Sequence, residues 1–211
     1  MQKIITEEML NELRENVKKG LSHRRYEHTL AVEEMVTLLA EIYCPEKMID
    51  LRAAALLHDI TKEYDDKVHI SMLSKPGIEF NKDEKLAPKT YHARTAALLI
   101  PEIYPEFSDD DVISAIRWHT TGRAGMSLVE KILYLADYID NSRTFSDCVK
   151  LREFFFSKDA GKMEEGERIE HLNRTLLLSF DMTIKALLDE GKIISKDTIN
   201  ARNDILCALN G

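Results

Sequence analysis

The sequence predicts an all-α fold, a compact helical bundle, and three observations carry that prediction. Apolar residues recur at helical spacing along most of the chain, whereas the alternation typical of strands is almost absent. The 211 residues include 8 glycines and 5 prolines, too few for sandwiches and barrels, which need turn residues about every ten positions. Residues that favour helix N-termini precede several of the apolar stretches.

The first part of the predicted bundle consists of three helices. Thr6 fits the N-cap of a helix that Gly20 ends. Ser22 can cap a second helix that reaches about Ile42 and carries its apolar residues along one stripe. Pro45 suits the first turn of a third helix, whose apolar residues end at a His-Asp dipeptide.

The second part resumes the helical pattern after a polar stretch. Residues 61–89 are predicted as a loop with room for a short helix. The next three helices are expected from Thr90 to Ile100, from Ser108 onward, and from Ser127, which begins a capping box, through Asp140. The charge-rich stretch from about 150 to 170 is predicted as an exposed excursion. A last amphipathic helix should span Leu172 to Glu190, with Gly191 as its C-cap.

Length and composition indicate one ordinary globular domain. We expect a single domain over residues 1–211, with a core at about 20–145 and C-terminal helices at about 150–211 packed on it. The net charge of −8 argues against binding to nucleic acid, which depends on clustered lysine and arginine.

The cysteines and the N-terminal residues predict a location. Cys44, Cys148 and Cys207 are far apart and odd in number, so they predict free thiols and no disulfide framework. The N-terminal residues are charged, and no uncharged apolar run approaches the roughly 18 residues of a membrane span. We therefore expect a cytoplasmic protein with no membrane partner.

Histidines and aspartates carry the candidate chemistry. Six of them lie on or at the end of predicted helices beside apolar residues: His28, His58, Asp59, His92, His119 and Asp137. A single buried histidine is usually a hydrogen-bonded core residue, but several imidazoles with two carboxylates make a poor core unless a cation neutralises them. Iron, manganese or zinc suits such ligands, and bundles build metal sites from facing helices. His23, His69 and His171 have polar neighbours and are predicted at the surface.

The order of these residues resembles a known superfamily. His28, the pair His58-Asp59 and Asp137 match the H…HD…D signature of the HD superfamily of metal-dependent phosphohydrolases. Two stretches, ALLHDITKEYD at 55–65 and AIRWHTTGRAGMSLVEKILYLADYID at 115–140, resemble its YqeK family, bacterial symmetrical bis(5'-nucleosyl)-tetraphosphatases. The resemblance covers about residues 8–203. It departs at Ile139-Asp140-Asn141, where that family has Ile-Glu-Pro, and at 155–172, which is longer.

The resemblance implies an HD-domain helical bundle that cleaves diadenosine tetraphosphate into two ADP, by attack of a metal-bound water on a β-phosphate. Its metal, iron or alternatively manganese or another divalent ion, would be held by four ligands: His28, His58, Asp59 and Asp137. His92 and His119 would bind a second ion or contact the phosphate. The implied catalytic residues are Asp59, Lys62, His92 and His119.

Residues around these ligands are candidates for nucleotide binding. Lys62 follows Asp59 by three residues, which puts its ammonium beside the metal. The full set that the resemblance implies is Arg25, Lys62, Glu63, Tyr64, Asp65, His92, His119, Thr120, Arg143 and Thr198. Gly122 either allows a ligand to approach the backbone or simply makes a turn between two helices.

Two other functions stay open at this point. The first is an HD phosphohydrolase of another nucleotide, such as an alarmone or a deoxynucleotide. The second is a non-catalytic module that senses a nucleotide or a metal. The expected partners are a dinucleoside polyphosphate substrate and an ADP- or GDP-like product, and a homodimer is left open. The chain has no phosphate-binding loop of the GxxxxGK[ST] type and no GxSxG nucleophile motif.

Overall fold

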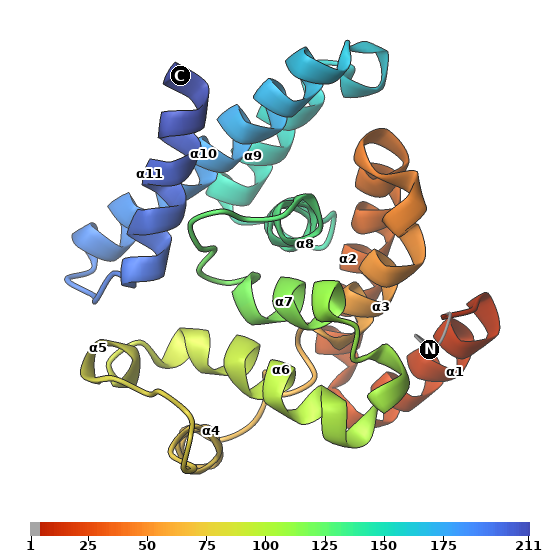
Figure 1. Ribbon diagram of the computed structural model, residues 1–211, viewed down its shortest axis with the longest axis vertical. Helices are drawn as coiled ribbons and strands as arrows, with labels where there is room; N and C mark the ends of the chain where they lie inside the picture. Colours follow the sequence, from red (N-terminus) through yellow and green to blue (C-terminus); the bar gives the residue numbers. More distant parts are fainter. Residues whose placement is uncertain (1–4) are drawn as a thin grey trace.

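A computed structural model describes residues 5–211, and within that range every regular element is a helix (Figure 1). This confirms the all-α prediction. The α-helices are α1 Glu7–Gly20, α2 His23–Tyr43, α3 Met48–Leu57, α4 Asp66–Leu73, α5 Lys82–Lys85, α6 Tyr91–Ile103, α7 Asp110–Trp118, α8 Leu128–Ile139, α9 Ser146–Phe156, α10 Glu165–Asp189 and α11 Lys196–Asn210. None of the helices in this part of the chain is long and apolar enough to cross a membrane.

Helix starts follow the capping residues in the sequence. The Thr6 side chain accepts a hydrogen bond from the Met9 amide, and the Ser22 side chain accepts one from the Arg25 amide. Ser127 forms the predicted capping box with Glu130 at the start of α8. Pro45 begins a short 3-10 turn, Pro45–Lys47, and α3 follows it, so the proline lies one turn earlier than predicted.

The stretch predicted as an exposed excursion, at about 150–170, is exposed over most of residues 156–167, but it begins in helix α9 and is anchored in the core. Leu151 and Phe155 lie four residues apart on α9, and both are buried in the main core. Their spacing defines an inner face, while the charged residues occupy the outer face. The polar stretch 61–89 also holds more helix than expected, because it contains both α4 and α5. The last predicted helix starts earlier, at Glu165, and Gly191 follows it with a φ of +61°.

Helix α8 is the centre of the arrangement. It is seen end-on in the middle of Figure 1, with α2 and α3 on one side, α9 and α10 on the other, and α7 beside it. Gly122, in the turn between α7 and α8, has a φ of +64°, and a Cβ there would lie 2.7 Å from Phe180 Cζ and 3.0 Å from Ala201 Cβ. The glycine therefore lets α10 and α11 pack onto this turn. One hydrophobic core includes residues of α1, of α11 and of most helices between them, and the single domain with the division at about 145–150 stays a prediction.

All three cysteines are free, as predicted. Cys44 and Cys148 are buried, and Cys207 is exposed. Burial raises the pKa of the Cys44 thiol to about 11, so that thiol stays protonated and unreactive at neutral pH.

Candidate metal and nucleotide site

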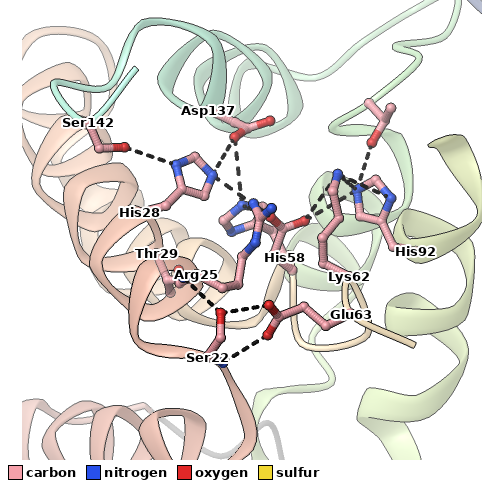
Figure 2. A network of polar contacts seen from close by, with 12 residues as sticks. Ser22, Arg25, His28, Thr29, His58, Lys62, Glu63, His92, Asp137 and Ser142 are labelled. Atoms are coloured by element: carbon pink, nitrogen blue, oxygen red, sulfur yellow. Dashed lines mark hydrogen bonds and ion pairs between the residues drawn. The ribbon is translucent and has the colours of Figure 1, made fainter. Parts of the chain in front are cut away.

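Six polar side chains from the ends or interiors of five helices converge on one site, and Figure 2 labels four of them, His28, His58, His92 and Asp137. His28 comes from the middle of α2 and Asp137 from α8, and their Nε2 and Oδ1 atoms lie 3.0 Å apart. His58 and Asp59 directly follow α3. His92 lies in the first turn of α6, and His119 directly follows α7. The structure thus brings together all six residues that the sequence singled out.

Helix ends fix the orientation of two of these imidazoles. The last carbonyl groups of a helix have no partner within it. His58 Nδ1 lies 2.6 Å from the Ala55 carbonyl oxygen, and His119 Nδ1 lies 2.7 Å from the Ile116 carbonyl oxygen. Each Nδ1 therefore carries its proton and donates it to the helix end, so Nε2 faces the site with a free lone pair.

The carboxylate of Asp59 lies in the middle and divides the site into two sides. On the side that we call the His28 side, Oδ2 accepts a hydrogen bond from Arg25 at 2.7 Å. The same oxygen lies 3.4 Å from His58 Nε2 and 3.8 Å from His28 Nε2. Asp137 completes this side and accepts a hydrogen bond from Arg143.

On the other side, the His92 side, Asp59 Oδ1 lies 3.2 Å from His92 Nε2 and 3.8 Å from His119 Nε2. Lys62 Nζ is 3.7 Å from the same oxygen and 2.9 Å from His92 Nε2. The Thr120 hydroxyl lies 3.2 Å from His92 Nε2.

The two sides differ in protonation. Burial opposes a charge on His28, but the carboxylates of Asp137 and Asp140 outweigh it and raise the pKa of His28 to about 9. On the His92 side burial prevails: it lowers the pKa of His119 to about 4 and holds the pKa of His92 well below its usual value. Burial also lowers the pKa of Lys62, against the attraction of Asp59.

Unpartnered buried atoms show that the site fits a metal ion. His28 Nε2, His58 Nε2 and Asp59 Oδ1 are buried with no hydrogen-bond partner. Buried polar atoms of this kind are rare in folded proteins, because losing water without a replacement is costly. Two sets of ligand atoms each lie within 4.8 Å of one another: His28, His58 and Asp137, and His58, Asp59 and His119. Imidazole and carboxylate ligands at these spacings suit a transition metal.

A pocket of about 460 Å³ opens beside the His92 side. Of the candidates for nucleotide binding, Lys62, Tyr64 and His92 line it. Its remaining lining residues were not among the candidates for nucleotide binding: Asp66, His69, Pro88 and Lys89.

The remaining nucleotide candidates lie in other surroundings. Arg25 and Arg143 pair with the carboxylates of the site. Glu63 accepts two hydrogen bonds from Ser22, at the start of α2. Asp65 is exposed before α4, and Thr198 is buried on α11. The residues just before Thr198 line a separate pocket of about 110 Å³ with α5.

The prediction that His69 and His171 are surface residues is wrong, whereas His23 is exposed as predicted. His69 is buried, and its Nδ1 lies 2.9 Å from the Thr95 hydroxyl. His171 is buried and stacks on Phe155, with ring centroids 5.4 Å apart. Polar sequence neighbours misled the prediction, because residues three and four positions away share a helix face. His69 lies four residues before the buried Leu73, and that spacing is the signal that could have identified it.

A helical bundle with a central His-Asp pair and further histidines from surrounding helices is the arrangement expected from the H…HD…D pattern of the sequence. The family model for the HD domain matches residues 25–142, more than half of the chain. This protein therefore belongs to the HD domain family.

Individual proteins that resemble this chain over most of its length give a more specific comparison than the family model. A protein of Halalkalibacterium halodurans named "Bis(5'-nucleosyl)-tetraphosphatase, symmetrical" is 34% identical over 90% of this chain and 93% of its own length. Proteins of the same name from Bacillus subtilis and Staphylococcus aureus are 30% and 27% identical, over 89% and 88% of this chain and 92% and 89% of theirs. A crystal structure from Clostridium acetobutylicum, described as a predicted HD superfamily hydrolase involved in NAD metabolism, matches with a TM-score of 0.80 and 32% identity, over 94% of this chain and 97% of that one.

Proposed function

We propose that this protein is a metal-dependent hydrolase that cleaves diadenosine tetraphosphate symmetrically into two ADP. One structural observation carries the proposal: buried ligand atoms of His28, His58 and Asp59 converge without hydrogen-bond partners, next to an open pocket. The names of the three relatives supply the substrate and the symmetry of the cleavage.

In this proposal His28, His58, Asp59 and Asp137 hold an iron ion, for which manganese or another divalent ion can substitute. When bound, such an ion polarises a phosphoryl oxygen and makes a water molecule a nucleophile at neutral pH. The paired guanidinium groups of Arg25 and Arg143 keep the Asp59 and Asp137 carboxylates in place. Asp59 is buried at the centre, and its Oδ1 has no hydrogen-bond partner and faces the His92 side. In this proposal Asp59 orients the attacking water as well as binding the metal.

Lys62 is the cation best placed to meet the polyphosphate. Its side chain is 33% exposed, whereas that of Asp59 is 2% exposed, so the ammonium bridges the buried site and the pocket. A positive charge held there stabilises the charge that develops on phosphate oxygens in the transition state. The pocket beyond Lys62 then takes one nucleoside half of the substrate between Tyr64 and Lys89.

For His92 and His119 the geometry favours ligation of a second ion over a protonated contact to phosphate. Asp59 presents Oδ1 to them while Oδ2 faces the His28 side. His58, Asp59 and His119 bring their ligand atoms within 4.8 Å of one another. Both imidazoles are buried, which disfavours the charged form that a phosphate contact needs.

The other expectations from the sequence stay predictions: cytoplasmic location, no nucleic-acid or membrane partner, and an open question of homodimer formation. Hydrolysis of an alarmone or a deoxynucleotide is the second candidate activity. The open pocket beside the ligands argues against a module that only senses metal, because a sensor has no need for space beside its ion.

Product analysis tests the proposal. Iron-loaded protein is incubated with diadenosine tetraphosphate in 18O-labelled water. The nucleotides are then separated and their masses are measured by mass spectrometry. We expect ADP as the main product, with one labelled oxygen in the β-phosphate of one of the two ADP molecules formed per turnover. AMP and ATP as the main products would contradict symmetrical cleavage. Turnover of an alarmone or deoxynucleotide alone would favour the second activity.

A further inference from the structure

Asp140 is a buried carboxylate beside the site that the proposed ligand set does not use. It follows α8 directly, and its exposed fraction is 0%. Oδ1 accepts hydrogen bonds from the Ser142 amide, at 2.8 Å, and from the Ser142 hydroxyl. Oδ2 is buried without a hydrogen-bond partner and lies 3.4 Å from Nδ1 of His28.

His28 needs an acceptor that its own helix does not supply. His58 and His119 donate Nδ1–H to unpaired carbonyl groups at the ends of α3 and α7. His28 lies inside α2, where the backbone carbonyl groups are bonded along the helix. Without an acceptor at Nδ1, the proton can move to Nε2, the atom that faces Asp59 and Asp137.

We propose that Asp140 is a positioning residue for the metal site: its Oδ2 accepts the Nδ1 proton of His28 and so keeps Nε2 free as a ligand. The inference rests on the proposed metal-dependent function. Carboxylates behind metal-bound histidines fix the tautomer and the orientation of the ring in this way.

Two neighbours bear on this role. The Ser142 hydroxyl lies 3.3 Å from His28 Nδ1 and donates its own hydrogen to Asp140 Oδ1. It can still accept the Nδ1 proton with a lone pair, and it is the competing acceptor, but a neutral hydroxyl is a weaker acceptor than a charged carboxylate. Arg143 Nε lies 3.2 Å from Asp140 Oδ2, but its hydrogen bond goes to the Asp137 carbonyl. The ion pair with Arg143 adds to the two hydrogen bonds from Ser142 in favouring the charged carboxylate, which is the stronger acceptor.

Substitutions separate the positioning role from a merely structural one. In Asp140→Asn the Ser142 amide still requires an oxygen at the Oδ1 position, so the new NH₂ group occupies the Oδ2 position and faces His28 Nδ1. Two donors cannot bond to each other, and the proton of His28 is driven to Nε2. Asp140→Ala leaves Nδ1 to the Ser142 hydroxyl or to water, which does less harm to the tautomer. A structural role predicts the opposite order, because Asn keeps the Ser142 contacts and Ala loses them.

Binding of Co²⁺ alone provides the readout, measured by competition with a chelator and by the visible absorption bands of the bound ion, with circular dichroism to confirm folding. We expect Asp140→Asn to bind about 10- to 100-fold more weakly than wild type and more weakly than Asp140→Ala. Ser142→Ala, the matched control, should bind close to wild type.

Wild-type affinity in Asp140→Asn, or weaker binding by Asp140→Ala than by Asp140→Asn, overturns the inference. A loss in Ser142→Ala as large as in Asp140→Asn overturns it as well, and names the hydroxyl as the acceptor. If Asp140→Ala does not fold, the comparison of folded Asp140→Asn with wild type and Ser142→Ala decides. Absence of Co²⁺ binding in the wild-type protein would contradict the proposed metal site itself, and the inference with it.

Discussion

The two sides of Asp59 use similar residues in opposite electrostatic settings. On the His28 side, carboxylates surround the imidazole and raise the pKa of His28 to about 9. On the His92 side, burial prevails and lowers the pKa of His119 to about 4. On the His28 side, the positive charges of Arg25 and Arg143 are paired with the carboxylates of Asp59 and Asp137. On the His92 side, Lys62 lies between the imidazoles and an open pocket.

This contrast indicates a division of work. Several carboxylates around one imidazole attract a cation, and the site can exchange the proton of the imidazole for a metal ion. On the His92 side, the neutral imidazoles can hold the proposed second ion, and Lys62 at the entrance suits a negatively charged substrate. Variants that remove one side at a time should therefore separate metal binding from substrate binding.

Asp137→Ala should have the largest effect. Asp137 offers a ligand oxygen 3.0 Å from His28 Nε2 and a charge, but little packing. We expect loss of bound metal and a fall in kcat/KM of more than about 10³-fold, as when a central catalytic group is removed. Helical circular dichroism should stay near wild type. The measurements are metal content of the purified protein and steady-state kinetics, and retained metal with normal turnover would remove Asp137 from the site.

Lys62→Ala should spare the metal and weaken catalysis. One lost charged contact to a transition-state phosphate costs about 10- to 1000-fold in kcat/KM. Lys67→Ala is the matched control, because Lys67 is an exposed lysine on the neighbouring helix α4. Metal content and kinetics are measured for both variants. Unchanged kinetics in Lys62→Ala would assign Lys62 to the solvated surface, and loss of metal would show that the two sides are not separable.

Metal affinity should rise with pH, because the His28 side must lose a proton to bind. The pKa of His28 is raised to about 9, so this imidazole is charged at neutral pH and becomes a ligand only when its proton leaves. Below that pKa, affinity should increase about tenfold per pH unit. His119, with its pKa lowered to about 4, is already neutral and adds no such dependence. Titrations with Co²⁺ at pH 6.5, 7.5 and 8.5 test this expectation, and a flat profile would contradict it.

The sequence was sufficient for the ligand candidates because each of them breaks a local pattern. Asp137 interrupts an apolar stretch, and the pair His58-Asp59 ends another. Such positions face inward whatever the details of the fold, so their convergence on one side of α8 could be expected. Capping residues likewise identified the starts of α1, α2 and α8, since a cap acts within one turn of the chain.

What the sequence did not predict depends on contacts between distant segments. The burial of His69 depends on neighbours such as Tyr64 and Tyr91, whose ring centroids each lie 6.0 Å from that of His69. The same holds for Asp140, which appeared in the sequence only as a departure from a family pattern. Its orientation toward His28 results from the packing of α2 against α8, and no local pattern encodes that packing.

Glu63 gives the smallest expected effect and tests where the site ends. The resemblance to the YqeK family places Glu63 among nucleotide-binding residues, but both of its oxygens accept hydrogen bonds from Ser22, at 2.8 Å and 2.6 Å. These contacts tie the segment after Asp59 to the start of α2, and the pKa of Glu63 is lowered because Ser22 stabilises its charged form.

Glu63→Ala should therefore lower the melting temperature by about 2–4 °C, the shift that roughly 1 kcal/mol produces in a protein of this size. The same variant should leave KM for diadenosine tetraphosphate unchanged. The melting temperature and KM are measured for Glu63→Ala. Glu63→Gln, which keeps one acceptor oxygen, is the control variant. A raised KM with unchanged stability would extend the site to Glu63 and make its contact with Ser22 incidental.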